Sequence, residues 1–282
     1  MTQPTTQPTS QPTPHLSRRH VLLGGAGVAG AAALAACSNA TSAPHGTGDG
    51  TVATGAAPSS TAPSAATTTL ATPATTAWVA GAPASYVPHG AGTRKEVALT
   101  FHLSGDPTLV ATLLDLLKNA SVPATVMAVG TWITAHPALT RRVVAEGHEL
   151  GNHTEHHLNM GSLSRSQVLA EIVDCGKALT PFIGGIGKWF RPSATVVPSQ
   201  LILDEAGKAG YPVSLGYDVD STDNTDPGSA VVLAKVKAGV KPGSIVSMHF
   251  GHAGTITAFP HVIAHLRSVG LTPVTVSTLL AP

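Results

Sequence analysis

The run Glu146-Gly-His-Glu-Leu-Gly-Asn-His-Thr-Glu-His-His157 gathers histidine and carboxylate side chains directly after an amphipathic helix predicted over residues 137–146. Imidazole is a ligand that suits Zn²⁺, and His153 and His157 are spaced so that both could bind one ion. An H-x-x-x-H pattern is weak evidence in a chain with 14 histidines among 282 residues. The rest of the sequence has to show whether this run belongs to a site.

Predicted strands and helices alternate on both sides of this run. Repeated β/α units with short connections imply an α/β fold with a parallel sheet, either a barrel or a doubly wound sheet. In both architectures, functional side chains lie at the carboxyl ends of the strands. The predicted strands cover residues 96–101, 124–129, 213–217, 244–249 and 272–276, and the predicted helices cover residues 107–119, 137–146, 164–182, 199–209, 229–240 and 261–269.

Polar side chains gather where predicted strands end. Residues 102–106 follow the first strand, residues 218–226 follow the strand at 213–217, and His249 and His252 end the strand at 244–249. Because carboxyl ends of parallel strands meet at one edge of a sheet, these segments predict a single site.

The N-terminal residues have the features of an export signal. Arg18 and Arg19 precede a Gly/Ala-rich apolar run that is too short to span a bilayer and ends in Leu34-Ala-Ala-Cys37. The arginine pair resembles a twin-arginine signal, and the segment before the cysteine resembles a lipobox. Residues 1–37 are therefore predicted to direct export. The protein is then either lipid-anchored through Cys37 at the outer face of the cytoplasmic membrane or secreted.

Composition separates a linker from a folded domain. Residues 38–92 are mostly Ala, Thr, Ser, Pro and Gly, which cannot bury enough apolar surface to offset the entropy of ordering. We predict a linker there and one domain over residues 93–282. The formal net charge of +1 and the absence of a basic stripe argue against a nucleic-acid partner.

The domain resembles a known family. The segment Ala124-Thr-Val-Met-Ala-Val-Gly130, then Trp132, His136-Pro137 and Gly147-His-Glu-Leu-Gly-Asn-His153, is similar in order and spacing to the polysaccharide deacetylases of the NodB-homology type, carbohydrate esterase family four. The resemblance implies a distorted, incomplete β/α barrel. It also implies removal of N- or O-acetyl groups from chitin, peptidoglycan, xylan or related glycans, with a divalent metal that is usually zinc.

The resemblance also assigns roles to side chains. It makes His153 and His157 metal ligands, Arg191 the residue that orients the base carboxylate, and His249 the general acid. The family's aspartate motif resembles Asp220-Ser-Thr-Asp223, although Asn224 follows where the family has tryptophan. One acidic residue within 218–223 is expected to hold the His249 imidazole protonated.

The first motif departs from the family. Where the family has Thr-Phe-Asp-Asp-Gly, with the first aspartate as base and the second as metal ligand, this chain has Thr100-Phe-His-Leu-Ser-Gly-Asp-Pro107. Asp106 is the carboxylate expected to return to the site, as base or as third metal ligand. His102 is the alternative for either role, because neutral imidazole can do both.

The sequence thus predicts a metal-dependent deacetylase of an acetylated polysaccharide, tethered to the membrane by lipid. Two other readings stay open: a glycan-binding surface lipoprotein with an altered site, and a metal hydrolase of a non-glycan amide or ester. Retention of His153, His157, Arg191, Asp220 and His249 favours the hydrolase.

Overall fold

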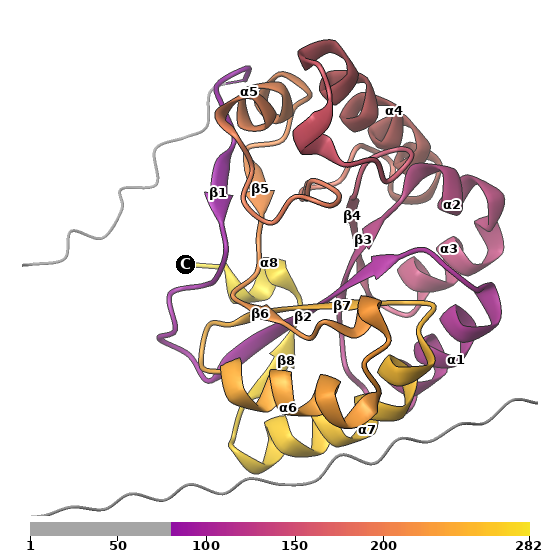
Figure 1. The fold of residues 1–282 in the computed structure, drawn as a ribbon, viewed down its shortest axis with the longest axis vertical. Coiled ribbons are helices and arrows are strands. Elements are labelled where there is room, and N and C mark those ends of the chain that lie inside the picture. Colours follow the sequence, from indigo (N-terminus) through magenta and orange to yellow (C-terminus); the bar gives the residue numbers. More distant parts are fainter. Residues whose placement is uncertain (1–79) are drawn as a thin grey trace, which may run out of the picture. The chain divides into compact units, whose positions relative to one another are not determined.

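Parallel strands form the centre of the computed structural model, which describes residues 80–282 (Figure 1). The main sheet runs in the order β4-β3-β2-β7-β6, and β8 also pairs with β2. Every ladder within it is parallel, as the alternation of strands and helices predicts. The strands are β2 (Glu96–Leu103), β3 (Thr125–Ala128), β4 (Glu149–Asn152), β6 (Val219–Asp220), β7 (Ile245–His249) and β8 (Thr272–Val274).

A second pair of strands extends the curve of the sheet. β1 (Ser85–Val87) pairs in parallel with β5 (Val213–Leu215). Phe190 forms single bridges to Asn152 at the end of β4 and to Ser214 in β5, so it links the two sets of strands. No ladder within residues 80–282 joins β1 to β6. The α/β fold class is confirmed, and the open path of strands has the form of an incomplete barrel.

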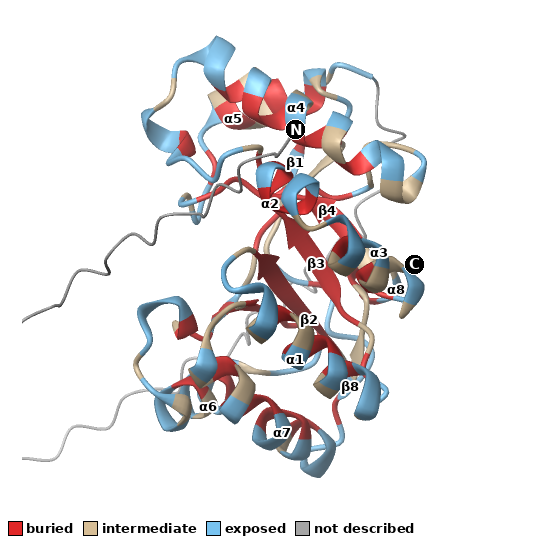
Figure 2. Cartoon of the chain, turned by 90° about the vertical axis from the view of Figure 1, so that its right-hand side faces the viewer, coloured by how far each residue is buried: buried red, intermediate tan, exposed pale blue. Residues whose placement is uncertain are grey.

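Helices cover the buried strands (Figure 2). In α1, Val110, Leu113, Leu114 and Leu117 are buried and follow the spacing of one helix face. The helix starts at Pro107, whose missing N–H would have no partner there. The helices are α1 (Pro107–Asn119), α2 (Gly130–Ala135), α3 (Pro137–Ala145), α4 (Arg165–Ile183), α5 (Gln200–Lys208), α6 (Ser229–Gly239), α7 (Ala253–Ser268) and α8 (Val276–Leu279), with short 3₁₀ turns η1 (Met160–Ser162) and η2 (Asp223–Thr225).

Predicted and observed helices agree best where the sequence marks the helix start clearly, by a proline or a capping box. The predicted helix over residues 107–119 coincides with α1, and the capping box predicted at Ser164 is present at the start of α4. By contrast, α7 begins at Ala253, eight residues before its predicted start, because Pro260 lies inside the helix instead of opening it. β4 was not predicted, since its Glu-Leu-Gly-Asn sequence lacks the β-branched and aromatic side chains that mark strands.

The start of the domain also differs from its prediction. β1 lies inside the segment predicted as linker, yet it is hydrogen-bonded to β5, so the boundary at residue 93 is too late. The predicted export signal, Cys37 and most of the linker lie outside the described residues. Within residues 80–282, no helix combines the length and apolar character needed to cross a bilayer.

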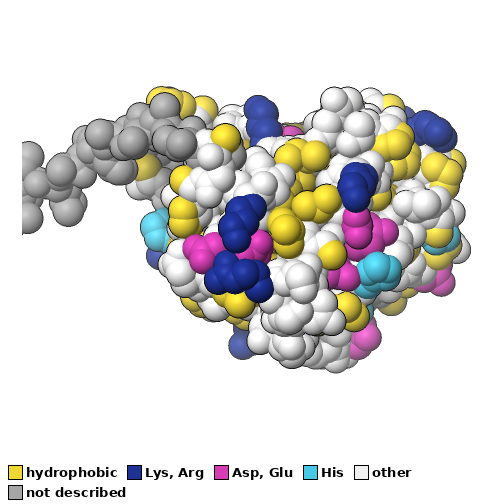
Figure 3. All heavy atoms as spheres, turned by 90° about the horizontal axis from the view of Figure 1, so that it is seen from above, with side chains coloured by type: hydrophobic (Ala, Val, Ile, Leu, Met, Phe, Trp, Pro, Cys, Tyr) yellow, Lys and Arg dark blue, Asp and Glu magenta, His cyan; other side chains and the backbone are white. Residues whose placement is uncertain are grey.

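Several charged side chains on the face seen in Figure 3 lie next to charges of the opposite sign. Between α4 and α5, Arg165 pairs with Asp204 and Glu205, and Lys208 pairs with Glu205 at 2.8 Å. These pairs leave no broad field of one sign on that face.

Two glycines hold the loop after β2 against the loop after β7. Gly251 has φ +81°, and a Cβ there would lie 2.9 Å from both the Gly105 Cα and the Ser104 oxygen. We therefore expect Gly251→Ala to lower the free energy of unfolding by about 1–3 kcal/mol. Gly254, in the first turn of α7, is the matched control, because a Cβ there meets nothing nearer than 3.8 Å. Urea unfolding should show Gly254→Ala neutral or slightly stabilising; equal losses in the two variants would contradict the close approach.

Candidate active site

A cavity of ≈ 300 Å³ opens at the carboxyl ends of the strands. It lies where the sequence placed the site, because β2, β4 and β7 all end there. Six of the predicted site residues meet in its wall. The lining residues are His102, His153, His157, Arg191, Pro192, Ala194, Thr195, Val196, Tyr217, Asp220, Asn224 and His249.

Strand register brings His102 and His249 together. The two residues are partners in the β2–β7 ladder, and His102 Nδ1 lies 2.7 Å from His249 Nε2. Arg191 Nη1 lies 3.0 Å from His102 Nε2. Arginine has only donors, so His102 Nε2 must accept, and the ring's proton must be on Nδ1. His102 therefore donates to His249 Nε2.

The chain of hydrogen bonds ends at Asp223. His249 Nδ1 donates to Asp223 Oδ1 at 2.7 Å, while Asp223 Oδ2 accepts from the His249 backbone N–H and the Thr255 hydroxyl. Burial alone would raise the pKa of Asp223, but the hydrogen bonds from His249 and Thr255 outweigh burial and lower it. Asp223 thus stays ionised and is the acidic residue of segment 218–223 that faces His249.

Asp220 occupies a different position from Asp223. It lines the cavity, but its carboxylate is exposed and accepts from the Thr222 backbone N–H at 2.8 Å. Sequence reasoning named Asp220 individually and treated Asp223 only as one member of an acidic segment. The signal that separates them is the 3₁₀ turn η2, which buries Asp223 beneath β7 and leaves Asp220 at the end of β6.

Arg191 is buried at the base of the cavity. Its guanidinium donates to the Leu215 and Gly216 carbonyls, to the Thr100 hydroxyl and to His102, and it packs on the Tyr217 ring at 5.3 Å. Burial lowers its pKa to about 10, so the group remains charged at neutral pH. The sequence predicted that Arg191 would orient a base; the group that it contacts is His102.

His153 has one free ring nitrogen. Its Nδ1 donates to the Arg191 carbonyl at 2.9 Å, and its buried Nε2 has no partner. The His157 ring follows at a centroid distance of 4.9 Å. Burial, reinforced by His157 and Arg191, lowers the pKa of His153 well below its usual value. An unpaired lone pair on a neutral imidazole fits a metal ligand or an acceptor of an N–H or O–H group.

The described residues do not complete the three-ligand metal site that the family implies. His153 and His157 supply two imidazoles, but both ring nitrogens of His102 are engaged in hydrogen bonds. Within residues 80–282, no group of three or more His, Cys, Asp or Glu side chains is arranged to hold a metal ion. The carboxylate that the resemblance expects as a metal ligand is therefore missing from the cavity.

The structure places Asp106 away from this cavity. Its carboxylate caps α1 by accepting from the Thr108 backbone N–H at 2.7 Å, and this bond lowers the pKa of Asp106. Asp106 is exposed and does not line the cavity. The expectation that Asp106 returns to the site as base or metal ligand is corrected, because the residue before a helix-opening proline is used as a cap.

Strand parity explains the missing ligand. β2 continues through Leu103, and successive side chains of a strand point to opposite faces. His102 therefore faces the cavity, whereas Leu103 is fully buried in the main hydrophobic core. The position at which the resemblance expects a second aspartate is therefore a core position.

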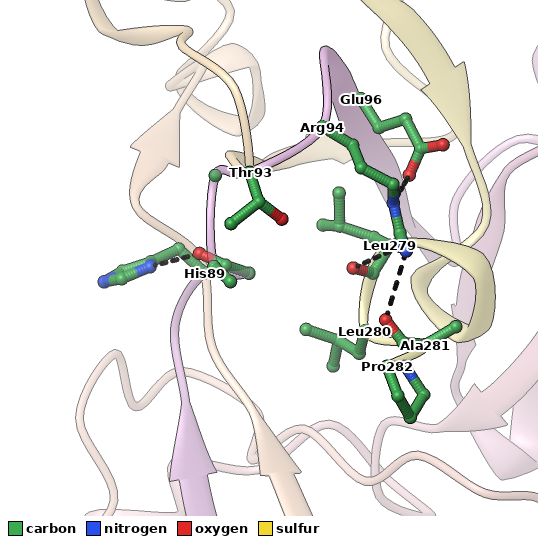
Figure 4. A pocket seen from close by; sticks show the side chains of 12 residues that line it. His89, Thr93, Arg94, Glu96, Leu279, Leu280, Ala281 and Pro282 are labelled. Carbon is green, nitrogen blue, oxygen red and sulfur yellow. Dashed lines mark hydrogen bonds and ion pairs between the residues drawn. The ribbon is translucent and has the colours of Figure 1, made fainter. Parts of the chain in front are cut away.

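A larger cavity of ≈ 350 Å³ lies at the amino end of β2, around Arg94 and Leu279 (Figure 4). Arg94 donates to Glu96 and to the carbonyls of Thr278, Leu279 and Ala281. These bonds hold α8 against the start of β2. The polar side chains that line this cavity therefore serve the packing of α8 and indicate no second site.

The fold and the histidine-lined cavity define an α/β protein with its site at the carboxyl edge of a parallel, barrel-like sheet. Residues 89–214 match the family model for polysaccharide deacetylases. A peptidoglycan-N-acetylglucosamine deacetylase of Bacillus cereus is 32% identical over 196 residues, which cover 66% of this chain and 88% of that protein. A chitooligosaccharide deacetylase of Bradyrhizobium is 32% identical over 161 residues, covering 57% and 73%. The chain belongs to the polysaccharide deacetylase family.

Solved structures agree with this assignment. A peptidoglycan N-acetylglucosamine deacetylase superposes with a TM-score of 0.65 at 26% identity, covering 69% of this chain and 92% of that one. A pseudoenzyme of carbohydrate esterase family four from Bacillus anthracis has the same fold, with a TM-score of 0.65 at 24% identity, covering 70% and 69%. The shared architecture therefore occurs in proteins with and without activity.

The core position of Leu103 can be tested by substitution. Leu103→Asp would bury a carboxylate among apolar side chains, so we expect it to lower the free energy of unfolding by about 3–5 kcal/mol, whereas Leu103→Met should cost less than about 1.5 kcal/mol. Chemical denaturation with and without zinc measures both variants. Strong stabilisation of Leu103→Asp by zinc would show that position 103 faces the cavity instead.

Proposed function

We propose that this protein is exported, held by lipid on Cys37 at the outer face of the cytoplasmic membrane, and removes acetyl groups from an acetylated polysaccharide there. The relatives named for peptidoglycan and chitooligosaccharide deacetylation support a glycan built on N-acetylglucosamine. The export signal and linker support a substrate outside the cytoplasm.

The observation that carries this proposal is the proton-handling set in one cavity. His153 Nε2 is an unpaired acceptor and would take the proton of an attacking water. His249 donates from Nδ1 to the buried Asp223 carboxylate and accepts from His102 at Nε2. It would take up a proton from solvent at Nε2 and then pass that proton to the departing amine or alcohol. In the free protein His102 donates a hydrogen bond to His249 Nε2. The leaving group would have to displace this bond to reach the same nitrogen.

His153 and His157 are also the imidazoles that would contact a divalent metal such as zinc. Because Nε2 carries the one free lone pair of His153, a metal bound there would exclude the role of His153 as base. A bound metal polarises the acetyl carbonyl and lowers the pKa of a bound water. Because the third ligand is missing, we expect zinc to bind weakly through these two side chains and to be removed by dialysis against a mild chelator. His153→Ala should abolish the remaining binding, as metal analysis before and after dialysis would show. A stoichiometric ion that survives dialysis would contradict the two-imidazole site.

A second function is favoured by a specific observation. Both family carboxylates of the first motif are replaced, one by His102 and one by the core residue Leu103. A protein with this change can bind an acetylated glycan in the cavity without hydrolysing it. The same fold in a pseudoenzyme is compatible with that alternative.

Acetate release separates the two functions. Purified protein is incubated with N-acetylated chito-oligosaccharides or peptidoglycan, with and without zinc, and acetate is quantified. We expect His249→Asn to lower the rate about 100-fold or more, because it removes the group that protonates the leaving atom. Asp106→Asn is the control, since asparagine also caps a helix and Asp106 lies outside the cavity.

Three results would change the proposal. Glycan binding without acetate release would establish the binding function. Release that is unaffected by His249→Asn would remove the role given to His249. Loss of activity in Asp106→Asn, with an unchanged unfolding curve, would restore the catalytic role that the sequence suggested for Asp106.

A further inference from the structure

The cavity contains a buried positive charge that has no carboxylate partner. Arg191 is 2% exposed, and each of its hydrogen bonds goes to a neutral acceptor. Asp220 lines the same cavity, but no ion pair joins it to Arg191 within the described part of the chain. Burying a cation without a counter-charge is costly, so this guanidinium is poised to gain from an incoming anion.

The hydrogen-bond inventory shows how an anion would be held. Two bonds come from Arg191 Nη1 and one each from Nε and Nη2, which leaves one Nη2 hydrogen without an acceptor. A carboxylate oxygen is the strongest common acceptor for such a group. The neighbouring acceptor, His153 Nε2, is buried and unpaired, and it needs a ligand that donates an N–H or O–H.

We propose that the cavity selects a glycan that carries a carboxylate, which accepts from Arg191 while an adjacent amide or hydroxyl group donates to His153. The inference rests on the proposed glycan substrate and narrows its class to an acidic sugar chain. The cavity side chain that accepts from Arg191 is the imidazole of His102 and not a carboxylate, so the charge of Arg191 is left for the ligand to neutralise. The lactyl group of a muramic acid residue without a stem peptide and the carboxyl group of a uronic acid both present a carboxylate beside hydroxyl or amide donors.

The test compares acids with their own neutral derivatives. Calorimetry measures the affinity of the protein for a muramic-acid-containing glycan fragment without stem peptides, for an oligouronate and for the methyl ester of each. We expect one of the two acids to bind about tenfold or more tightly than its ester, because the ester cannot form the charge-assisted bond to Arg191. Which acid shows the preference identifies the source of the carboxylate.

A matched pair of variants tests the geometry. His102→Asp places a carboxylate of the protein beside Arg191 and should remove the preference for the acid. His102→Asn changes the same position without adding charge and should retain the preference. Unfolding curves confirm that both variants are folded, and Arg191 itself is left intact because it joins several elements.

Equal affinity of wild type for acid and ester, with both ligand classes, would overturn the inference, as would an undiminished preference in His102→Asp. These readouts do not use acetate release. A preference for the acid without any acetate release would therefore support the carboxylate site while rejecting the proposed hydrolase activity.

Discussion

The buried guanidinium of Arg191 is the interaction on which the site depends. Its donors reach β2 through Thr100, the end of β5 through Leu215 and Gly216, and the cavity through His102. Its own carbonyl orients His153. One residue therefore fixes the spacing between strands at opposite sides of the cavity and sets the protonation pattern of two imidazoles. Few substitutions at this position could preserve both effects, because lysine has neither the planar fork nor the reach to several acceptors.

The sequence predicted the alternating architecture and the edge of the sheet that carries the site. Both predictions rest on patterns that are local: apolar runs, caps and polar residues after strands. The helix over residues 107–119 was predicted because Pro107 and the apolar leucines mark it. His153 was named for its spacing to His157, His249 for its place at the end of a predicted strand, and Arg191 for the family resemblance.

What sequence reasoning missed depends on contacts between distant segments. The hydrogen-bond partner of His249 is Asp223 and not Asp220. Asp223 reaches His249 because the chain forms a 3₁₀ turn of three residues there, and no sequence pattern predicts that turn. The Asp106 carboxylate could either cap α1 or reach the cavity as a base or ligand. It caps α1, because the Thr108 backbone N–H two residues away donates to it. Likewise, Leu103 became a core residue because β2 continues one residue past His102.

The parallel pairing of β1 with β5 has a consequence for how the domain is presented. β5 ends at the cavity, where Leu215 and Gly216 contact Arg191, so Ser85 at the start of β1 lies at the far rim of the sheet. The lipid anchor that we propose on Cys37 would therefore be attached to the domain at the rim opposite the cavity, which leaves the cavity side free to meet a large substrate.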